Sequence, residues 1–150
     1  MKNFQMGWRF TDKKYNLLPP DDLLKIEPIM ENDSETIWHE YVSQNHGHLM
    51  LMKNRGNIYE KAFRVNWDDE KNGRKILNDQ LNMKHSKELI FMWSPVASVK
   101  TTWGIVINYW TDFFYPDDDT VILFKGENIK LYYCEENIFT YKARDIITII

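Results

Sequence analysis

Three consecutive aspartates are the residues with the clearest chemical potential, in the stretch YWTDFFYPDDDTVILF at residues 109–124. Carboxylates that converge on metal ions activate water in two-metal nucleases and phosphatases. Alternate residues of a strand point to the same face, so two of these aspartates can share one side. A metal-dependent hydrolase is therefore one hypothesis for this chain. Its candidate ligands are Asp112, Asp117 and Asp119, with His46 or His48 as a further ligand.

A simpler interpretation treats the same residues as a hydrated turn. Pro116 ends the preceding element, and the aspartates after it place charge at the start of a β-strand, where charge discourages pairing between molecules. A calcium-binding EF-hand loop is excluded, because Ile122 occupies the position where that loop needs glycine. The spacing favours a turn over a metal site.

The other reactive side chains lack the partners that catalysis requires. Cys134 is followed by two glutamates that oppose formation of a thiolate, so we expect a small apolar core residue. His46 and His48 flank Gly47 where we expect a helix to end, which favours surface positions over a zinc site. The chain contains no H-E-x-x-H, G-x-S-x-G, Walker or G-x-G-x-x-G motif. The sequence therefore indicates no cofactor and no catalytic residue.

Aromatic residues make up 15% of the chain, an unusually large share for a small domain. Most of these rings are needed to build a core. An exposed subset beside acidic residues would form a protein-binding surface, in which the rings anchor a partner and the acids steer its basic side chains. The candidate residues for this surface are Trp110, Tyr115, Asp117, Asp118 and Asp119. Packing of all these rings in the core is the competing interpretation, and a small-ligand pocket lined by tryptophans is a third.

Charge and composition limit the partners. The formal net charge is −3, and no cluster of Lys and Arg suits a phosphate backbone, so nucleic acid is disfavoured. The longest apolar runs, LIFMW and WGIVI, are far shorter than the roughly 20 residues that span a bilayer. The single cysteine, and an amino terminus without the apolar stretch of a signal peptide, predict the cytoplasm.

Helical spacing recurs in several segments that would position these side chains. Pro20 suits the first turn of a helix, and the two aspartates after it complement the helix dipole. Residues 101–114 carry both helical spacing and strand alternation, and Thr101 or Thr102 as an N-cap favours a helix. The expected helices cover residues 20–26, the segment from Asp33 or Ser34 to just before Gly47, residues 72–81 and residues 101–114.

Strand patterns surround these helices. The run ELIFMW is continuously apolar, as in a buried central strand, and residues 120–143 contain three β-runs separated by KGEN and EEN. The expected strands are a short one at residues 8–10, a hairpin within residues 48–65, the run at residues 88–93, the three-stranded meander, and an edge strand at residues 145–150. An exposed edge there would permit strand pairing between two copies, and the oligomeric state is left open. Residues 1–150 are therefore expected to form one α+β domain, with helices on one face of an antiparallel sheet.

Several of these segments together resemble a known family. They are the opening WRF, the segment LLPPDDLLKIEPI, the helix that contains Trp38, and the stretch VKTTWGIVINYWTDFFYPDDD. In order and spacing they resemble the bacterial proteins grouped as domain of unknown function 2947. The resemblance implies a small, soluble, cytoplasmic bacterial protein and brings no catalytic residues with it. Small acidic α+β proteins are also similar in fold and charge to immunity proteins that neutralise secreted toxins.

Overall fold

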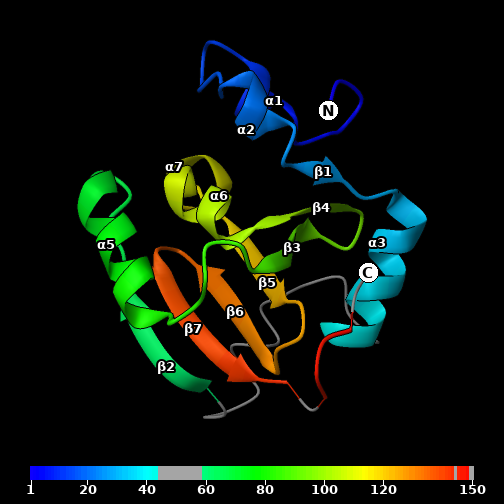
Figure 1. Ribbon diagram of the computed structural model, residues 1–150, viewed down its shortest axis with the longest axis vertical. Helices are drawn as coiled ribbons and strands as arrows, with labels where there is room; N and C mark the ends of the chain where they lie inside the picture. Colours follow the sequence, from blue (N-terminus) through cyan, green and yellow to red (C-terminus); the bar gives the residue numbers. More distant parts are fainter. Residues whose placement is uncertain (44–58, 144, 149–150) are drawn as a thin grey trace.

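An antiparallel sheet forms the centre of the molecule (Figure 1). The computed structural model describes residues 1–43, 59–143 and 145–148, and within them seven strands pair in the order β1-β4-β3-β5-β6-β7-β2. The strands are β1 (Glu27–Pro28), β2 (Tyr59–Arg64), β3 (Glu88–Ser94), β4 (Ala97–Thr102), β5 (Asp119–Phe124), β6 (Ile129–Cys134) and β7 (Asn137–Lys142).

The central strands β3 and β5 are apolar along most of their length because both faces of the sheet are covered. Phe91 of β3 pairs with Ile122 of β5, and both side chains are fully buried in a main core on one face. Their neighbours Met92 and Val121 also pair and are fully buried in a second core. Successive side chains of a strand point to opposite faces, so the two cores lie on opposite sides of the same strands.

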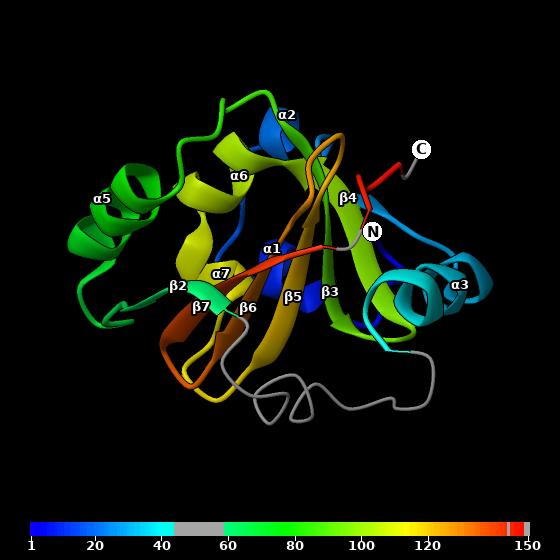
Figure 2. The same ribbon diagram turned by 90° about the horizontal axis from the view of Figure 1, so that it is seen from below.

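Helices cover both faces of the sheet. α5, α6 and α7 lie on one side, and α3 lies on the other (Figure 2). Trp38 of α3 is buried in the second core, whereas Leu77 of α5 and Phe10 of α1 are buried in the main core. Helices on one face were expected, and α3 adds cover to the opposite face. The helices are α1 (Trp8–Thr11), α2 (Pro20–Leu23), α3 (Glu31–Tyr41), α5 (Glu70–Gln80), α6 (Trp103–Asn108) and α7 (Trp110–Phe113).

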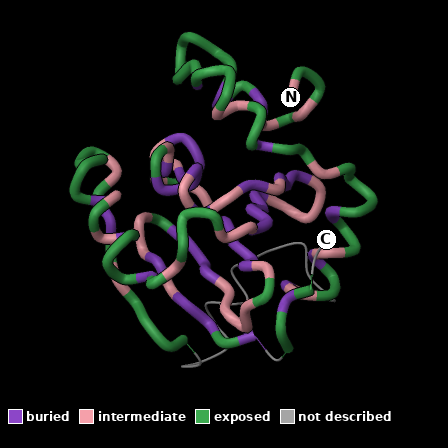
Figure 3. The backbone as a smooth tube through the Cα atoms, viewed as in Figure 1, coloured by how far each residue is buried: buried purple, intermediate pink, exposed green. Residues whose placement is uncertain are grey.

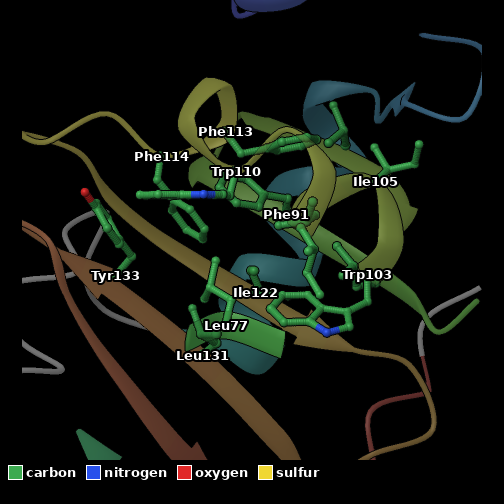
Figure 4. Close-up of a cluster of buried hydrophobic side chains, with 14 of the residues drawn as sticks. Leu77, Phe91, Trp103, Ile105, Trp110, Phe113, Phe114, Ile122, Leu131 and Tyr133 are labelled. Atoms are coloured by element: carbon green, nitrogen blue, oxygen red, sulfur yellow. The ribbon is translucent and has the colours of Figure 1, made fainter. Parts of the chain in front are cut away.

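Aromatic rings dominate the main core (Figure 4). The Phe91 ring lies 4.6 Å from Trp93, 5.0 Å from Phe113 and 5.1 Å from Phe114, measured between ring centroids. Phe114 also stacks on Tyr133 of β6 at 4.5 Å. Each such pair adds roughly 0.5–1.5 kcal/mol beyond the area that it buries. These ring contacts therefore pack α7 against the centre of the sheet.

A glycine brings α5 close to α7. A Cβ atom placed on Gly73 would lie 2.1 Å from the Cζ2 atom of Trp110, so the indole occupies the space of the missing side chain. Only glycine permits this approach without displacement of the ring. α5 is therefore seated directly on the indole of Trp110.

Buried positions follow the strands β3 to β7 together with α6 and α7, whereas β2 and much of the N-terminal segment and of α5 are exposed (Figure 3). Cys134 is buried in the second core, which agrees with the core position expected for it. Among the helices that the structure describes, none combines the length and apolar content needed to cross a membrane.

The α+β class, the antiparallel sheet and the C-terminal meander are confirmed. Gly126 has a φ of 78° in the turn between β5 and β6, a conformation that glycine adopts readily. Glu135 and Glu136 make the turn between β6 and β7, also with positive φ. The expected helices at residues 20–26 and 72–81 correspond to α2, which ends earlier, and α5. The helix expected from Asp33 or Ser34 to just before Gly47 is α3, but it begins after the N-cap Met30 and ends at Tyr41.

Two expected strands are wrong. Residues 8–10 belong to α1, because a helical turn buries Phe10 in the main core and directs Arg9 towards an aspartate after α7. The segment at residues 145–150 was expected to be an edge strand, but residues 145–148 form no strand. Ile147 instead exchanges backbone hydrogen bonds with Gly126 and Glu127 at 2.7 and 2.8 Å, which anchors the C-terminal segment on a turn.

The segment expected as one helix at residues 101–114 is divided. Thr101 and Thr102 end β4, a strand that the sequence analysis did not predict. α6 and α7 follow, separated at Tyr109, whose backbone leaves the helical region with φ −123° and ψ 32°. The first half of the expected hairpin at residues 48–65 lies outside the described residues, and its second half is β2, which pairs with β7.

Candidate functional site

The residues of the predicted binding surface lie at different depths in the molecule. Trp110 is fully buried, and its indole Nε1 donates a hydrogen bond to the Glu70 carbonyl oxygen at 2.8 Å. Asp117 is exposed, whereas Asp118 and Asp119 are half-buried. Trp110 therefore packs the interior and is not an exposed anchor for a partner.

Asp118 is held by Arg9 of α1. The buried guanidinium donates to both carboxylate oxygens of Asp118, at 2.8 and 3.2 Å, and to the Phe113 carbonyl oxygen at 3.4 Å. Its Cζ atom lies 4.2 Å from the ring centroid of Tyr115 and 5.6 Å from that of Trp93. Asp118 also accepts a hydrogen bond from the Tyr115 backbone amide at 2.8 Å. This arrangement, the Arg9 clamp, joins the N-terminal segment to the turn after α7.

The proposed metal ligands are not gathered at one point. Asp119 begins β5 and accepts a hydrogen bond at 3.3 Å from the hydroxyl of Tyr132, a residue of the second core. Within residues 1–43, 59–143 and 145–148, no group of three or more His, Cys, Asp or Glu side chains is placed to hold a metal ion. His46 and His48 lie outside these residues.

A groove opens beside the Arg9 clamp. It lies between the segment after α1, the start of α5 and the end of α7, and its volume is about 640 Å³. Ligand pockets typically measure roughly 300–1,000 Å³. We call it the Asp112 groove. Its walls include Tyr15, Asn16, Trp67, Glu70, Asp112 and Tyr115.

Asp112 is the buried carboxylate of this groove, with an exposed fraction of 8%. Its Oδ2 atom accepts a hydrogen bond from Asn16 Nδ2 at 2.8 Å. In the part of the chain that the structure describes, no hydrogen bond reaches Oδ1 and no cation forms an ion pair with this carboxylate. Burial raises the pKa of Asp112, and the negative charge of Glu70 raises it further. The hydrogen bond from Asn16 and the positive charge of Arg9 act in the opposite direction and lower the pKa. A desolvated carboxylate with a perturbed pKa in a cleft is a functional-site candidate.

Four rings form a continuous aromatic wall beside Asp112. Trp8 lies 4.7 Å from Tyr15 and 5.9 Å from Tyr115, and Tyr115 meets the edge of Trp67 at 5.9 Å. Trp8 and Tyr15 are 37% and 48% exposed, respectively. The aromatic wall, formed by these residues, therefore reaches from the groove to the outer surface.

Hydrogen bonds fix the α5 side of the groove. The Trp67 backbone amide donates to Glu136 Oε2 at 2.9 Å, and its indole Nε1 donates to the Thr111 carbonyl oxygen at 2.9 Å. Asp69 caps α5 by accepting a hydrogen bond from the Asn72 amide at 3.3 Å. These hydrogen bonds therefore hold Trp67, which precedes α5 in the chain, between the β6–β7 turn and α7.

A hydrogen bond connects α2 to the junction between α6 and α7. The Tyr109 hydroxyl donates a hydrogen bond to the Asp22 carboxylate. This hydrogen bond, together with burial and nearby negative charge, raises the pKa of Tyr109 to about 12. The hydroxyl keeps its proton at neutral pH, so the bond persists there.

Two other hollows lie near α3 and β1, and their chemistry differs. The carboxylates that line them belong to Glu31, Asp33 and Glu40, and all three residues are exposed. Water solvates such groups well, so they do not require a ligand. The Asp112 groove differs from these hollows in its buried carboxylate.

Two residues of this groove were predicted from the sequence as candidate functional residues. Tyr115 was placed on a binding surface, and Asp112 was named, though as a metal ligand. Asn16 and Trp67 were missed, because they lie 96 and 44 residues from their hydrogen-bond partners along the chain, and no local pattern predicts such contacts.

The fold and the groove together define a class of protein: an antiparallel α+β domain with a buried carboxylate and an aromatic wall beside the end of α7. Residues 1–141 match the model of the family described as Protein of unknown function (DUF2947), and the chain belongs to this family. No curated protein and no solved structure matches the chain.

Proposed function

We propose that this chain is a non-catalytic binding module, and that it holds another protein at the Asp112 groove and the aromatic wall. The observation that carries the proposal is the carboxylate of Asp112, which is buried without an ion-pair partner among the described residues. Burial of an unpaired charge costs free energy, and a partner that supplied the opposite charge would offset that cost.

The aromatic wall supports a protein as the partner. Trp8 and Tyr15 leave large ring surfaces in contact with water at the mouth of the groove. Exposed Trp and Tyr beside polar groups are typical of the anchor residues of protein interfaces. The net charge of −3 would favour the approach of a basic partner.

A cytoplasmic bacterial setting is part of the proposal. Cys134 is the single cysteine of the sequence and is buried, which suits a reducing compartment, in which disulfides are rare. A metal-dependent hydrolase receives no support from the geometry around Asp112, Asp117 and Asp119, because no group of three or more His, Cys, Asp or Glu side chains among the described residues is placed to hold a metal ion.

The proposal is tested by affinity capture from the native cell extract with four tagged variants. Asp112→Asn removes the buried charge, and Tyr15→Ala removes an exposed ring of the wall. Asp117→Asn is the matched control for charge, because Asp117 is exposed outside the groove. Tyr59→Ala is the matched control for the ring, because Tyr59 lies on β2 and is 46% exposed.

We expect at least one protein to be captured by the wild type and by both controls, and to be lost with both groove variants. The purified protein should then bind the purified wild type directly. If every captured protein is retained by Asp112→Asn and Tyr15→Ala, the groove is not the binding surface.

A further inference from the structure

The unpaired carboxylate also indicates which chemical group occupies the groove. Resting on the function proposed above, we infer that the Asp112 groove takes an arginine side chain of the partner protein, whose guanidinium pairs with Asp112 and lies against the aromatic wall. The three observations that support this are the state of the carboxylate, the nature of the rings, and the way the molecule binds its own Arg9.

Among the described residues no cation pairs with the Asp112 carboxylate, although cations lie nearby. Lys14 also lines the groove, but its Nζ atom lies 5.8 Å from the ring centroid of Tyr15 and forms no ion pair among the described residues. Arg74 is bound to Glu70 at 2.9 Å and to the Asn108 carbonyl oxygen at 3.2 Å. Asp112 therefore has an oxygen, Oδ1, ready to accept a hydrogen bond from an entering donor.

The rings favour a flat cation over a compact one. Guanidinium is planar, stacks on aromatic faces, and donates two parallel hydrogen bonds to a carboxylate. An ammonium group is a more strongly hydrated point charge, so its transfer from water to a half-buried site costs more free energy. Tyr115 and Trp67 line the same groove as Asp112, so both elements of guanidinium recognition are present together.

The Arg9 clamp shows the same chemistry at the Tyr115 ring itself. There a buried guanidinium forms a bidentate pair with Asp118, while its Cζ atom lies 4.2 Å from the Tyr115 ring. Arg9 is thus paired with Asp118. Asp112 and Tyr115 likewise offer a carboxylate and a ring in one groove, and the arginine of the partner protein would supply the cation.

The test measures the binding of short peptide probes to the wild-type protein and to the Asp112→Asn variant. The probes are acetyl-Gly-Arg-Gly-amide, the citrulline peptide of the same shape without charge, and the lysine peptide. Binding is followed by NMR through the indole N–H signal of Trp67, with the indole signal of Trp38 in the second core as the internal control. A single side chain is expected to bind with a dissociation constant in the millimolar range.

We expect the arginine peptide to shift the Trp67 signal saturably and to leave the Trp38 signal in place. The citrulline peptide should bind about tenfold more weakly, as should the arginine peptide to Asp112→Asn, because a charge-assisted pair is lost. The lysine peptide should also bind more weakly than the arginine peptide.

Three results would overturn the inference: no binding of the arginine peptide, equal binding of arginine and citrulline peptides, or unchanged binding to Asp112→Asn. Equal or tighter binding of the lysine peptide would overturn the preference for arginine. These failures are separable from failure of the proposed function, because a protein partner lost with both groove variants would still establish the groove as its binding surface.

Discussion

Asp112 and Asp118 are both aspartates near the end of α7, and their surroundings give them opposite roles. Asp118 is paired with Arg9, so its charge is compensated inside the molecule. Asp112 has only the neutral amide of Asn16 as a side-chain partner among the described residues. Asp118 therefore belongs to the structure, and Asp112 is the residue free to meet a ligand.

The Arg9 clamp predicts unequal effects within the aspartate triplet. Asp118→Ala leaves the Arg9 guanidinium buried without its counter-charge, and should lower the free energy of unfolding by about 3 kcal/mol. Asp117→Ala alters an exposed side chain and should change the free energy of unfolding by less than about 0.5 kcal/mol. Urea unfolding of the two variants measures the difference. Equal stability of the two variants would show that the clamp contributes nothing.

The raised pKa of Asp112 predicts a dependence of stability on pH. The folded state holds the proton more tightly than the unfolded chain, so ionisation destabilises the fold as the pH rises from 3.8, the ordinary value, through the raised folded value. The full penalty is present above the folded pKa and absent below the ordinary one.

Asp112→Asn removes this penalty while it keeps an oxygen that can accept the Asn16 hydrogen bond. The variant should therefore be more stable than the wild type at pH 7, and the difference should shrink as the pH is lowered towards 4. Urea unfolding across this range checks it, with Asp117→Asn as the exposed control. A variant that is less stable than the wild type at pH 7 would contradict this account.

At the scale of elements, the contact between α5 and α7 depends on the absence of a side chain at Gly73. Gly73→Ala would force its Cβ into the Trp110 indole and should cost roughly 1–3 kcal/mol of unfolding free energy. Asn72→Ala changes the adjacent exposed position of the same helix and should alter stability by less than about 0.5 kcal/mol. Thermal unfolding compares the two.

A double variant tests the cause of that cost. In a Trp110→Phe background the smaller ring leaves room for the new methyl group, so Gly73→Ala should cost less there than in the wild type. The same cost in both backgrounds would mean that another contact, and not the indole, is responsible.

The elements that the sequence predicted are those with strong local signals. β3 and the meander have apolar runs bounded by turns, and α3 and α5 have regular helical spacing. β4 was missed because Ser98, Lys100 and two threonines interrupt its apolar character. α1 was misread because its helical turn is fixed by Phe10 in the core and by the contact of Arg9 with Asp118, which are distant along the chain.

The groove was less predictable than the fold, for a related physical reason. Asp112 and Tyr115 lie in one conspicuous stretch, but the burial of Asp112 depends on the packing around it and its hydrogen bond comes from Asn16. Trp110, in the same stretch, is an aromatic residue of the same apparent kind and lies entirely in the core. Residue type and local spacing do not distinguish these depths; packing between distant segments does.

At the scale of the whole molecule, one sheet separates two cores, and its central strands contribute side chains to both. Loss of the sheet would expose both cores at once, so we expect a single cooperative unfolding transition. Far-UV circular dichroism and tryptophan fluorescence should give the same urea midpoint. Separate midpoints would show that the α3 side unfolds independently of the side that carries α5, α6 and α7.

The acidic, aromatic groove is the central feature of the proposed function, and one measurement tests it most directly. It is the dissociation constant of a purified, captured partner for the wild type and for Asp112→Asn, measured by titration calorimetry at constant pH and salt. The account predicts binding that is at least about tenfold weaker for Asp112→Asn, because a buried charge pair is lost. Equal dissociation constants for the two proteins would contradict it.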